Sequence, residues 1–292
     1  MSFLKTKRNE DRRMNCKIIV DSCGELTDTQ KADPCFVSVP LELDVDESHF
    51  VDDESFSQAD FLQKVKASKN CPKSSCPSPE RYLEAYQSEQ ERIYVVTLSA
   101  KLSGSYNSAQ LAKQLYEEEY GEKQIYVFDS KSASVGETLI AMKIKEYEQK
   151  GLFFEEVVQK TEEYISSQNT YFVLETLDTL QKNGRLSNLK ALVAGALNIK
   201  PVMGSTPEGN ICELAKSRGM NKALERMAQE IVSRLPDDAQ RTLGISHCNC
   251  PERAELLKEK LEQKGQFKEI FIVDTAGIST MYANDGGIIV AV

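Results

Sequence analysis

The chain has 292 residues, and its 45 acidic and 36 basic side chains give a formal net charge of −9. A chain of this length exceeds the size at which one hydrophobic core stops growing, so two domains are expected. Beyond the first thirteen residues the sequence has no Lys/Arg cluster, which argues against binding to nucleic acid or to an anionic membrane surface.

The expected location of the protein rests on two kinds of segment that the sequence lacks, and the domain limits are predicted with it. No apolar run approaches the roughly 20 residues that span a bilayer, and the stretch MSFLKTKRNEDRRMN has no apolar signal-peptide core. We therefore expect a cytoplasmic protein without a transmembrane segment. Residues 1–15 are expected to be a disordered tail, residues 16–169 an N-terminal α/β domain, and residues 170–292 a C-terminal α/β domain.

The eight cysteines are expected to be free thiols. A chain of this length does not need disulfides for stability, and no export signal places it in an oxidising compartment. Cys71 and Cys76, and the tight group His247, Cys248 and Cys250, do not have the paired spacing of zinc ligands. No metal site is therefore expected.

The first predicted strand, residues 17–20, ends in the polar sequence Asp21-Ser22-Cys23-Gly24. Open α/β sheets place their ligand sites at this end of their strands. The pattern then predicts a strand over 36–43, an acidic loop over 44–54 that holds His49, and a helix over 55–68. We assign His49 no role, because an exposed His among acids is usually solvated.

Two serine-rich loops come next. Residues 70–79 contain three prolines, which exclude a helix and hold an extended path that carries Ser74. Residues 95–109 (VVTLSAKLSGSYNSA) pass from a buried strand through Ser103, Gly104 and Ser105 into a helix. The unpaired N–H groups at such a helix start suit an anion. The alternative, that these serines only cap the helix, remains open.

The middle of the chain alternates strands with helices, which predicts a parallel sheet. The expected strands are 124–128 and 171–174, and the expected helices are 80–88, 135–150 and 154–165. A short helix then ends at Asn183-Gly184 and holds Arg185 on a turn, before a helix over 189–197.

Cationic residues and a histidine mark the last third of the chain. Residues 200–203 and 210–214 predict an antiparallel hairpin that leads to Lys216 and Arg218, although Lys and Arg are most often simple surface charges. Helices are expected over 219–235 and 251–264, and strands over 242–246 and 269–273, the latter being the last clear strand. His247 ends the strand 242–246, where a binding role and a purely structural role are both open.

Taken together, these motifs resemble the DegV family, whose members bind a long-chain fatty acid between two α/β domains. The resemblance covers nearly the whole chain from Lys17. It is carried by KIIVDSCGEL, KSSCPSP, LSGSYNSA, VFDS, LQKNGRLS, NIKPVM with the later KSR, and ISH. The resemblance implies an α/β protein of two α/β domains with a ligand cleft between them.

The same resemblance implies a set of site residues. Ser74 and Ser103 would hydrogen-bond the fatty-acid carboxylate, and apolar side chains between the domains would enclose its tail. The full set of fatty-acid-binding residues is expected to be Ser74, Ser103, Gly104, Ser105, Arg185, His247 and Tyr282. Arg185, Lys216 and Arg218 are expected to face the phosphate or a partner, because cations stabilise the charge of a forming acyl phosphate.

In better understood relatives the loaded protein is the substrate carrier of a fatty acid kinase, which phosphorylates the bound carboxylate to an acyl phosphate. Such a carrier needs no nucleotide site, and this chain has neither a Walker A loop nor a G-x-G-x-x-G motif. We therefore expect no cofactor. Many relatives have a His-x-Gly-Pro-Gly stretch where this chain has Tyr282-Ala-Asn-Asp-Gly286. Tyrosine can donate a hydrogen bond but is neutral at pH 7.

Two other classes of protein are alternatives. The first is a serine hydrolase acting on a lipid ester or another small ester, with Ser103 as nucleophile and His247 as base. Ser103 does not lie in a G-x-S-x-G elbow, and the sequence places no carboxylate to orient His247. The second alternative is an interaction protein with an empty cleft.

Overall fold

The first sheet is parallel and belongs to the N-terminal half of the chain. The computed structural model describes residues 15–186, 198–235 and 241–292. The sheet has the strand order β2-β1-β6-β7 and is built from β1 (Cys16–Asp21), β2 (Phe36–Val39), β6 (Arg92–Thr97) and β7 (Gln124–Asp129). Every neighbouring pair of strands runs parallel, which confirms the expectation for this part of the chain.

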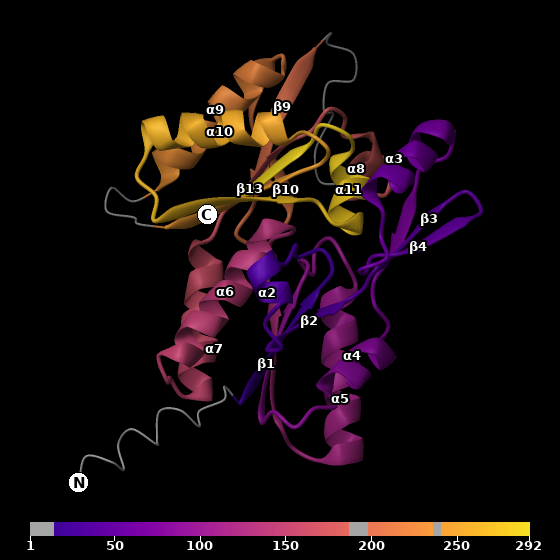
Figure 1. Cartoon of the computed structure of the whole chain (residues 1–292), viewed down its shortest axis with the longest axis vertical. Coiled ribbons are helices and arrows are strands. Elements are labelled where there is room, and N and C mark those ends of the chain that lie inside the picture. Colours follow the sequence, from indigo (N-terminus) through magenta and orange to yellow (C-terminus); the bar gives the residue numbers. More distant parts are fainter. Residues whose placement is uncertain (1–14, 187–197, 236–240) are drawn as a thin grey trace.

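Helices cover both faces of this sheet (Figure 1). The helices around it are α2 (Asp28–Lys31), α4 (Pro79–Tyr86), α5 (Ser105–Tyr120), α6 (Val135–Gln149) and α7 (Phe154–Ser167). Side chains alternate along β1, so that Ile18 and Val20 pack toward α6 and α7 while Ile19 packs toward α4 and α5. Because both faces are buried, the centre of the strand, Ile18 to Val20, is apolar.

The second sheet is mixed, so the expectation of a parallel sheet is wrong for this part. Its order is β10-β9-β8-β13-β11-β12. The strands are β8 (Thr170–Val173), β9 (Ile199–Ser205), β10 (Ile211–Arg218), β11 (Thr242–His247), β12 (Glu269–Asp274) and β13 (Ile288–Ala291). Only β11 and β12 pair in parallel, and the remaining neighbours pair antiparallel. The expected hairpin is confirmed as β9 and β10.

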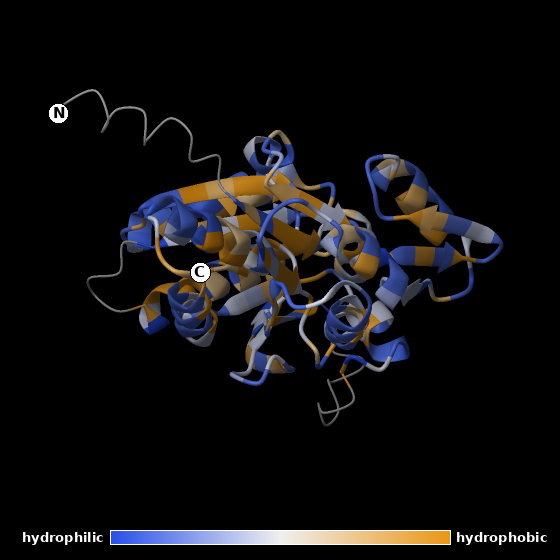
Figure 2. Ribbon diagram, turned by 90° about the horizontal axis from the view of Figure 1, so that it is seen from below, coloured by the Kyte–Doolittle hydropathy of each residue, from blue (hydrophilic) through white to orange (hydrophobic). Residues whose placement is uncertain are grey.

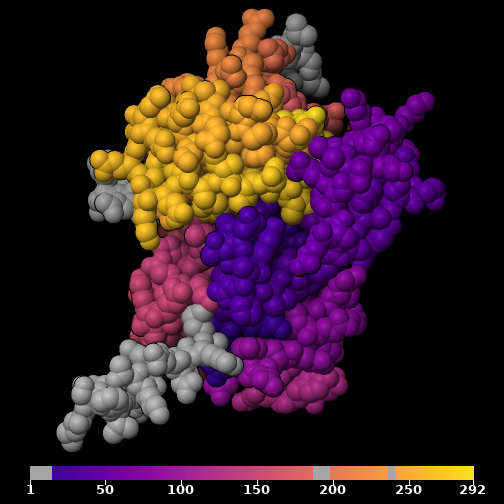
Figure 3. Space-filling model, in the orientation of Figure 1, coloured from indigo at the N-terminus to yellow at the C-terminus, as the bar shows by residue number. Residues whose placement is uncertain are grey.

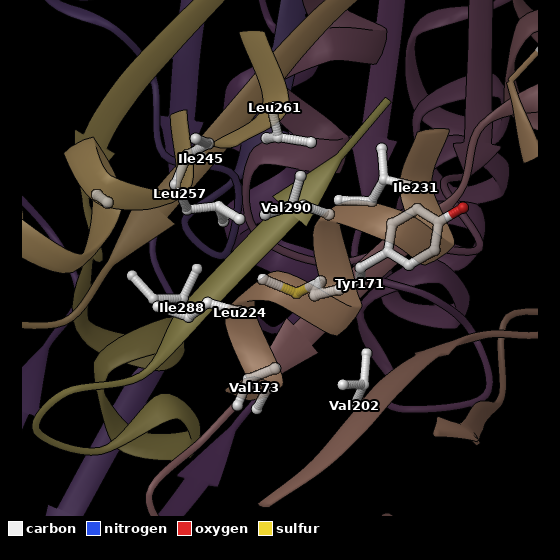
Figure 4. Packing of buried hydrophobic residues seen from close by; sticks show 14 of the residues in the cluster. Tyr171, Val173, Val202, Leu224, Ile231, Ile245, Leu257, Leu261, Ile288 and Val290 are labelled. Carbon is white, nitrogen blue, oxygen red and sulfur yellow. The ribbon is translucent and has the colours of Figure 1, made fainter. Parts of the chain in front are cut away.

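The sequence does not predict the strand β13, because its last clear strand pattern is 269–273. It lies between β8 and β11, inside the second sheet. On one face of this sheet, α9 (Met220–Arg234) and α10 (Pro251–Lys264) close a core that contains Leu224, Leu257 and Val290 (Figure 4). In Figure 2 the strands at the centre are largely hydrophobic, whereas the helices carry hydrophilic outer faces.

Helix α6 lies between the two sheets and belongs to both cores. Its residues Ile140 and Ile144 pack in the first core, while Val135 and Leu139 pack against Ala291 of β13. Gly244 of β11 lets the helix come this close, since a Cβ there would lie 3.0 Å from the Val135 Cβ. The two α/β parts therefore share one helical layer.

A third, small sheet projects beside the second one. It consists of β3 (Glu42–Val45), β4 (Ser48–Val51) and β5 (Lys73–Ser75) in the order β4-β3-β5, and α3 (Gln58–Ala67) packs beside it. We call residues 42–75 the arm. In Figure 3 the arm, in purple, lies against the yellow C-terminal part of the chain. Two further short helices, α8 (Asp178–Lys182) and α11 (Gly277–Ala283), lie near it.

The arm corrects two sequence predictions. The expected strand over 36–43 is two strands, β2 and β3, because the path breaks at Pro40. The expected acidic loop over 44–54 contains the strand β4, which pairs with β3 as a hairpin. In this hairpin Asp44 lies opposite His49. The carboxylate of Asp44 is 2.9 Å from Nδ1 of His49, so the acidic residues form the exposed side of a strand rather than a loop.

Two predictions lie outside the described residues. These are the disordered tail, apart from residue 15, and the whole of the helix over 189–197. Among the residues that the structure does describe, no helix is long and apolar enough to cross a bilayer.

Candidate functional site

A cavity lies between the two sheets, with walls from the loops that follow the strands of the first sheet and from strands and helices of the second α/β part. Its volume is about 750 Å³, counting the space open to solvent at its rim, and its exposed wall is almost entirely apolar. The apolar lining includes Leu98, Leu102, Phe172, Leu174, Ile278 and Ile289. The polar lining residues pair with one another, since the hydroxyls of Ser132 and Thr170 are hydrogen-bonded and Ser205 accepts from the Thr170 N–H.

A polar cluster lies at the rim of this cavity. The Ser74 hydroxyl is 3.2 Å from the Tyr282 hydroxyl, and the Arg185 guanidinium lies 5.7 Å from the centre of the Tyr282 ring. Arg185 and Tyr282 both line the cavity. Burial raises the pKa of the Tyr282 phenol, so the ring stays neutral at pH 7 and can donate a hydrogen bond. Three chain segments far apart in sequence thus meet at one point.

The direction of Arg185 is set by the end of α8. Gly184 has a φ of 76°, the left-handed conformation that ends a helix most easily with glycine. The guanidinium then donates from Nε to the Leu102 carbonyl over 3.2 Å and from Nη1 to the Asn183 carbonyl. Because Leu102 belongs to the first α/β part and Arg185 to the second, this side chain joins the two across the rim.

The two serine-rich loops lie side by side. A Cβ on Gly104 would be 3.1 Å from the Cys76 sulfur, and that sulfur is 3.9 Å from the Ser108 hydroxyl. The Ser103 hydroxyl accepts from the Ser105 N–H over 3.1 Å. Ser103 thus binds the first N–H of α5, whose N-cap is Gly104 and makes no side-chain cap bond. The Ser103 hydroxyl hydrogen is still able to donate to an anion.

Ser105 is turned inward. It is fully buried, and its hydroxyl donates to the Asp21 carboxylate and lies 2.6 Å from the Tyr82 hydroxyl. Asp21 also accepts from the Leu98 N–H over 2.8 Å. Its hydroxyl thus holds the Ser103–Gly104 loop to the end of β1, and the expected contact of Ser105 with a ligand stays a prediction.

His247, Lys216 and Arg218 are not part of this cavity's lining. His247 is buried at the end of β11, where Nδ1 accepts from the Cys250 N–H and lies 3.4 Å from an Asp274 carboxylate oxygen. Lys216 and Arg218 are exposed on the edge strand β10, and Lys216 pairs with Glu213 at 3.4 Å. Among the described residues no hydrogen bond joins Ser103 to His247, as a hydrolase would need.

Sequence reasoning missed the buried carboxyl groups behind the site. Glu25, Asp52 and Glu137 are almost fully buried. Burial raises the pKa of Glu25 to about 7 and that of Asp52 to about 6. Burial, and then the charge of Asp21, raise the pKa of Glu137 well above its usual range. The available signal for polar groups at this end of the first sheet is the Asp-Ser sequence that ends two of its strands, at 21–22 and 129–130. Asp21 and Asp129 both accept backbone N–H groups of the loop 98–100.

The cysteines do not gather with other ligands. In the part of the chain that the structure describes, no group of three or more His, Cys, Asp or Glu side chains could hold a metal ion. All eight cysteines are free thiols, as expected. Cys16 and Cys35 come closest to each other, with a sulfur–sulfur distance of 3.4 Å.

Comparison with known proteins places this geometry in a family. The model of the DegV family, described as an uncharacterised protein family, matches residues 15–292. The chain belongs to the DegV family. A DegV domain-containing protein of Streptococcus gordonii is 36% identical over 282 residues, covering 94% of this chain and 98% of that relative.

Solved DegV-family structures share the fold. A DegV-family protein of Ruminococcus gnavus, refined with vaccenic acid, is 58% identical with a TM-score of 0.94, covering 96% of this chain and 100% of that one. The fatty acid kinase (Fak) B3 protein of Streptococcus pneumoniae, loaded with linoleic acid, is 36% identical with a TM-score of 0.87, covering 95% and 99%. A DegV-family protein of Eubacterium eligens, loaded with heptadecanoic acid, is 26% identical with a TM-score of 0.86, covering 94% and 98%. The α/β fold class and the family expected from the sequence are confirmed.

Proposed function

We propose that the chain binds a long-chain fatty acid, with its tail in the cavity between the sheets and its carboxylate at the rim. The observation that carries this proposal is an apolar cavity whose rim holds the Ser74, Tyr282 and Arg185 cluster. Ser103, in the adjoining loop, would supply a further hydroxyl. Long-chain acids in the R. gnavus and S. pneumoniae relatives support the same choice of ligand.

The physical chemistry of this cavity suits an amphipathic ligand with one charged end. Each methylene buried in an apolar wall contributes about 0.8 kcal/mol, so a long tail supplies strong affinity. A carboxylate leaving water must be paired or hydrogen-bonded. The hydroxyls of Ser74 and Tyr282 are donors of the required kind, and the Arg185 guanidinium beside them adds a positive charge.

The second part of the proposal is that the loaded protein presents this carboxylate to a fatty acid kinase in the cytoplasm, without a cofactor of its own. The S. pneumoniae relative is a fatty acid kinase protein by name. Arg185 would stabilise the charge of a forming acyl phosphate through its planar, two-pronged donors. Lys216 and Arg218, both exposed on β10, are assigned to the surface that a partner would approach.

Native mass spectrometry of the purified protein tests the ligand. We expect a population heavier than the apoprotein by the mass of one long-chain fatty acid, which solvent extraction releases as the free acid. Re-addition of oleate to the extracted protein should restore the mass, while oleyl alcohol should bind more weakly. The proposal fails if neither purified nor reloaded protein carries a fatty acid, and ester hydrolysis by the protein would favour the hydrolase instead.

Arg185→Ala tests the kinase part. Loading with free fatty acid should remain largely intact, because Ser74 and Ser103 keep their hydroxyls. Acyl-phosphate formation with a cognate kinase and ATP should fall by tenfold or more, which is about the effect of losing one hydrogen bond that involves a charged group. Loss of loading as severe as that of Ser103→Ala would make Arg185 a carboxylate anchor and contradict this assignment. Failure of every kinase of the source organism to act on the wild-type protein would contradict the partnership itself.

A further inference from the structure

Helix α11 follows β12 in the chain but packs against the N-terminal part of the protein. Its residues Ile278 and Met281 share a core with Leu43, Val45 and Phe61 of the arm. In Figure 1 the helix lies between the second sheet and α3. In Figure 3 the yellow C-terminal part of the chain, to which the helix belongs, contacts the purple arm. The arm therefore packs against a helix that lies between β12 and β13 in the chain.

Asp52, at the end of β4, makes the polar part of this contact. One carboxylate oxygen accepts from the Gly277 N–H over 2.6 Å, and the other accepts from the Ile278 N–H over 2.8 Å. The second oxygen also accepts from the Ser22 hydroxyl over 2.9 Å. Asp52 is only 3% exposed, so these bonds are shielded from water and fix the start of α11 in position.

Gly277 shows how closely the two segments fit. A Cβ at this position would lie 2.6 Å from an Asp52 carboxylate oxygen and 2.8 Å from Cδ1 of Leu43. Any other residue would push the helix away from the arm. A second link comes from α3, where the Gln58 amide donates to the Thr275 carbonyl over 3.0 Å.

The far end of the same short helix carries Tyr282. From there the tyrosine hydroxyl reaches Ser74 on β5, a strand of the arm, over 3.2 Å. The arm thus contacts α11 at both ends, at Asp52 and at Ser74, and the helix contributes Ile278, Ser279 and Tyr282 to the cavity between these two points.

We propose that Asp52 is a positioning residue of the fatty-acid site, whose carboxylate fixes the start of α11 on the arm and so holds Tyr282 beside Ser74 at the rim. This inference rests on the proposed function, because its readout is fatty-acid binding. Asp52 touches no ligand in this account and acts only through the helix.

Asp52→Asn tests the role with little change of size. An amide keeps one acceptor but turns an N–H₂ group toward a backbone N–H, so the start of α11 should loosen. We expect fatty acid to leave the protein about fivefold faster, the effect of losing roughly one helix cap. Asp53→Asn is the matched control, because it removes the same charge from the neighbouring exposed residue, which bonds to Ser55. Equal release rates in the two variants would overturn the proposal.

A double-mutant cycle separates positioning from general stability. Tyr282→Phe removes the hydroxyl through which Asp52 is argued to act, so Asp52→Asn should change the release rate less than twofold in that background. Fully additive effects would mean that Asp52 supports the fold without acting through Tyr282, which would overturn the inference.

Measurements on the wild-type protein distinguish failure of the proposed function from failure of this inference. If the wild type binds no fatty acid, the proposed function fails. If it binds and Asp52→Asn binds equally well, only this inference fails. Should Asp52→Asn not fold, Gln58→Ala carries the test, because it removes the second link to α11 from a partly buried position. It should speed release about twofold to fivefold, again only when Tyr282 is present. Unchanged release in Gln58→Ala would overturn the proposal.

Discussion

Ser74 is the residue that tests the rim cluster most directly, and its binding of the carboxylate stays a prediction. Its hydroxyl meets Tyr282 at the rim, whereas Ser75 is exposed and, on a strand, points to the opposite face. Ser74→Ala should weaken fatty-acid affinity roughly tenfold or more, the cost of one hydrogen bond to a charged acceptor. Isothermal titration of delipidated protein measures this, and Ser75→Ala is the control. Equal losses in the two variants would remove Ser74 from the site.

Ser103 differs from Ser74 because it also accepts the Ser105 N–H. Ser103→Ala should therefore lose both affinity and about 1 kcal/mol of unfolding free energy. Urea unfolding of the ligand-free protein gives the second quantity. A change in stability alone would leave Ser103 as a structural cap.

Glu25 makes stability depend on pH. The Ser134 hydroxyl donates to one of its oxygens over 2.7 Å, and the carboxyl is otherwise buried. Burial raises its pKa from 4.5 to about 7, so the folded state binds this proton more tightly than the unfolded state. The contribution to stability is present below pH 4.5 and is lost as the pH rises through about 7.

The corresponding measurement is urea unfolding of the wild type and of Glu25→Gln at pH 5 and pH 8. The wild type should lose up to roughly 3 kcal/mol more than the variant between these pH values. Asp52, with its pKa raised to about 6 by burial, contributes with the same sign in both proteins and cancels in the comparison. Equal losses would mean that Glu25 is not protonated in the folded protein.

At the scale of elements, periodicity predicts the helices and strands that bury one or two faces. It misses the elements that form only because distant segments contact them. The long helices α5, α6, α9 and α10 and the strands of the first sheet follow from their apolar patterns. The strand β4 has acidic neighbours that suggest a loop, and it is a strand because it pairs with β3. Helix α11 is short and its start is capped by Asp52, so no local signal marks it.

The end of α8 offers a test of one such element. Gly184 has a φ of 76°, and a Cβ there would meet nothing within 4 Å, so Gly184→Ala should cost about 1–2 kcal/mol through the backbone alone. Because the turn directs Arg185, acyl-phosphate formation should fall as well. Gly121→Ala is the control, since Gly121 has a φ of 88°, equally open surroundings and a place at the end of α5. It should lose stability without losing activity, and equal activity losses would contradict the positioning of Arg185 by this turn.

Across the whole molecule, the site unites segments that the sequence alone cannot bring together. Ser74 and Tyr282 are 208 positions apart, and Asp52 and Gly277 are 225 apart. Spacing arguments operate within one helix or strand, so the pairing of the two serine-rich loops was inferred from residue type and from family resemblance. The apolar lining from β8, α11 and β13 required the order of the second sheet, which local patterns do not encode.

Because segments of both α/β parts line the cavity, a bound fatty acid should stabilise the molecule as a unit. At a free ligand concentration of 100 times Kd the gain is about 2.7 kcal/mol, which corresponds to a rise in Tm of roughly 4–5 °C for a chain of this size. Calorimetry of extracted and oleate-loaded protein should show this shift in one transition, since α6 and α11 join the two cores. Oleyl alcohol should give a smaller shift, because it leaves the rim donors without a carboxylate. An equal shift with the alcohol would mean that the cavity binds any long apolar chain and that the rim does not recognise the acid.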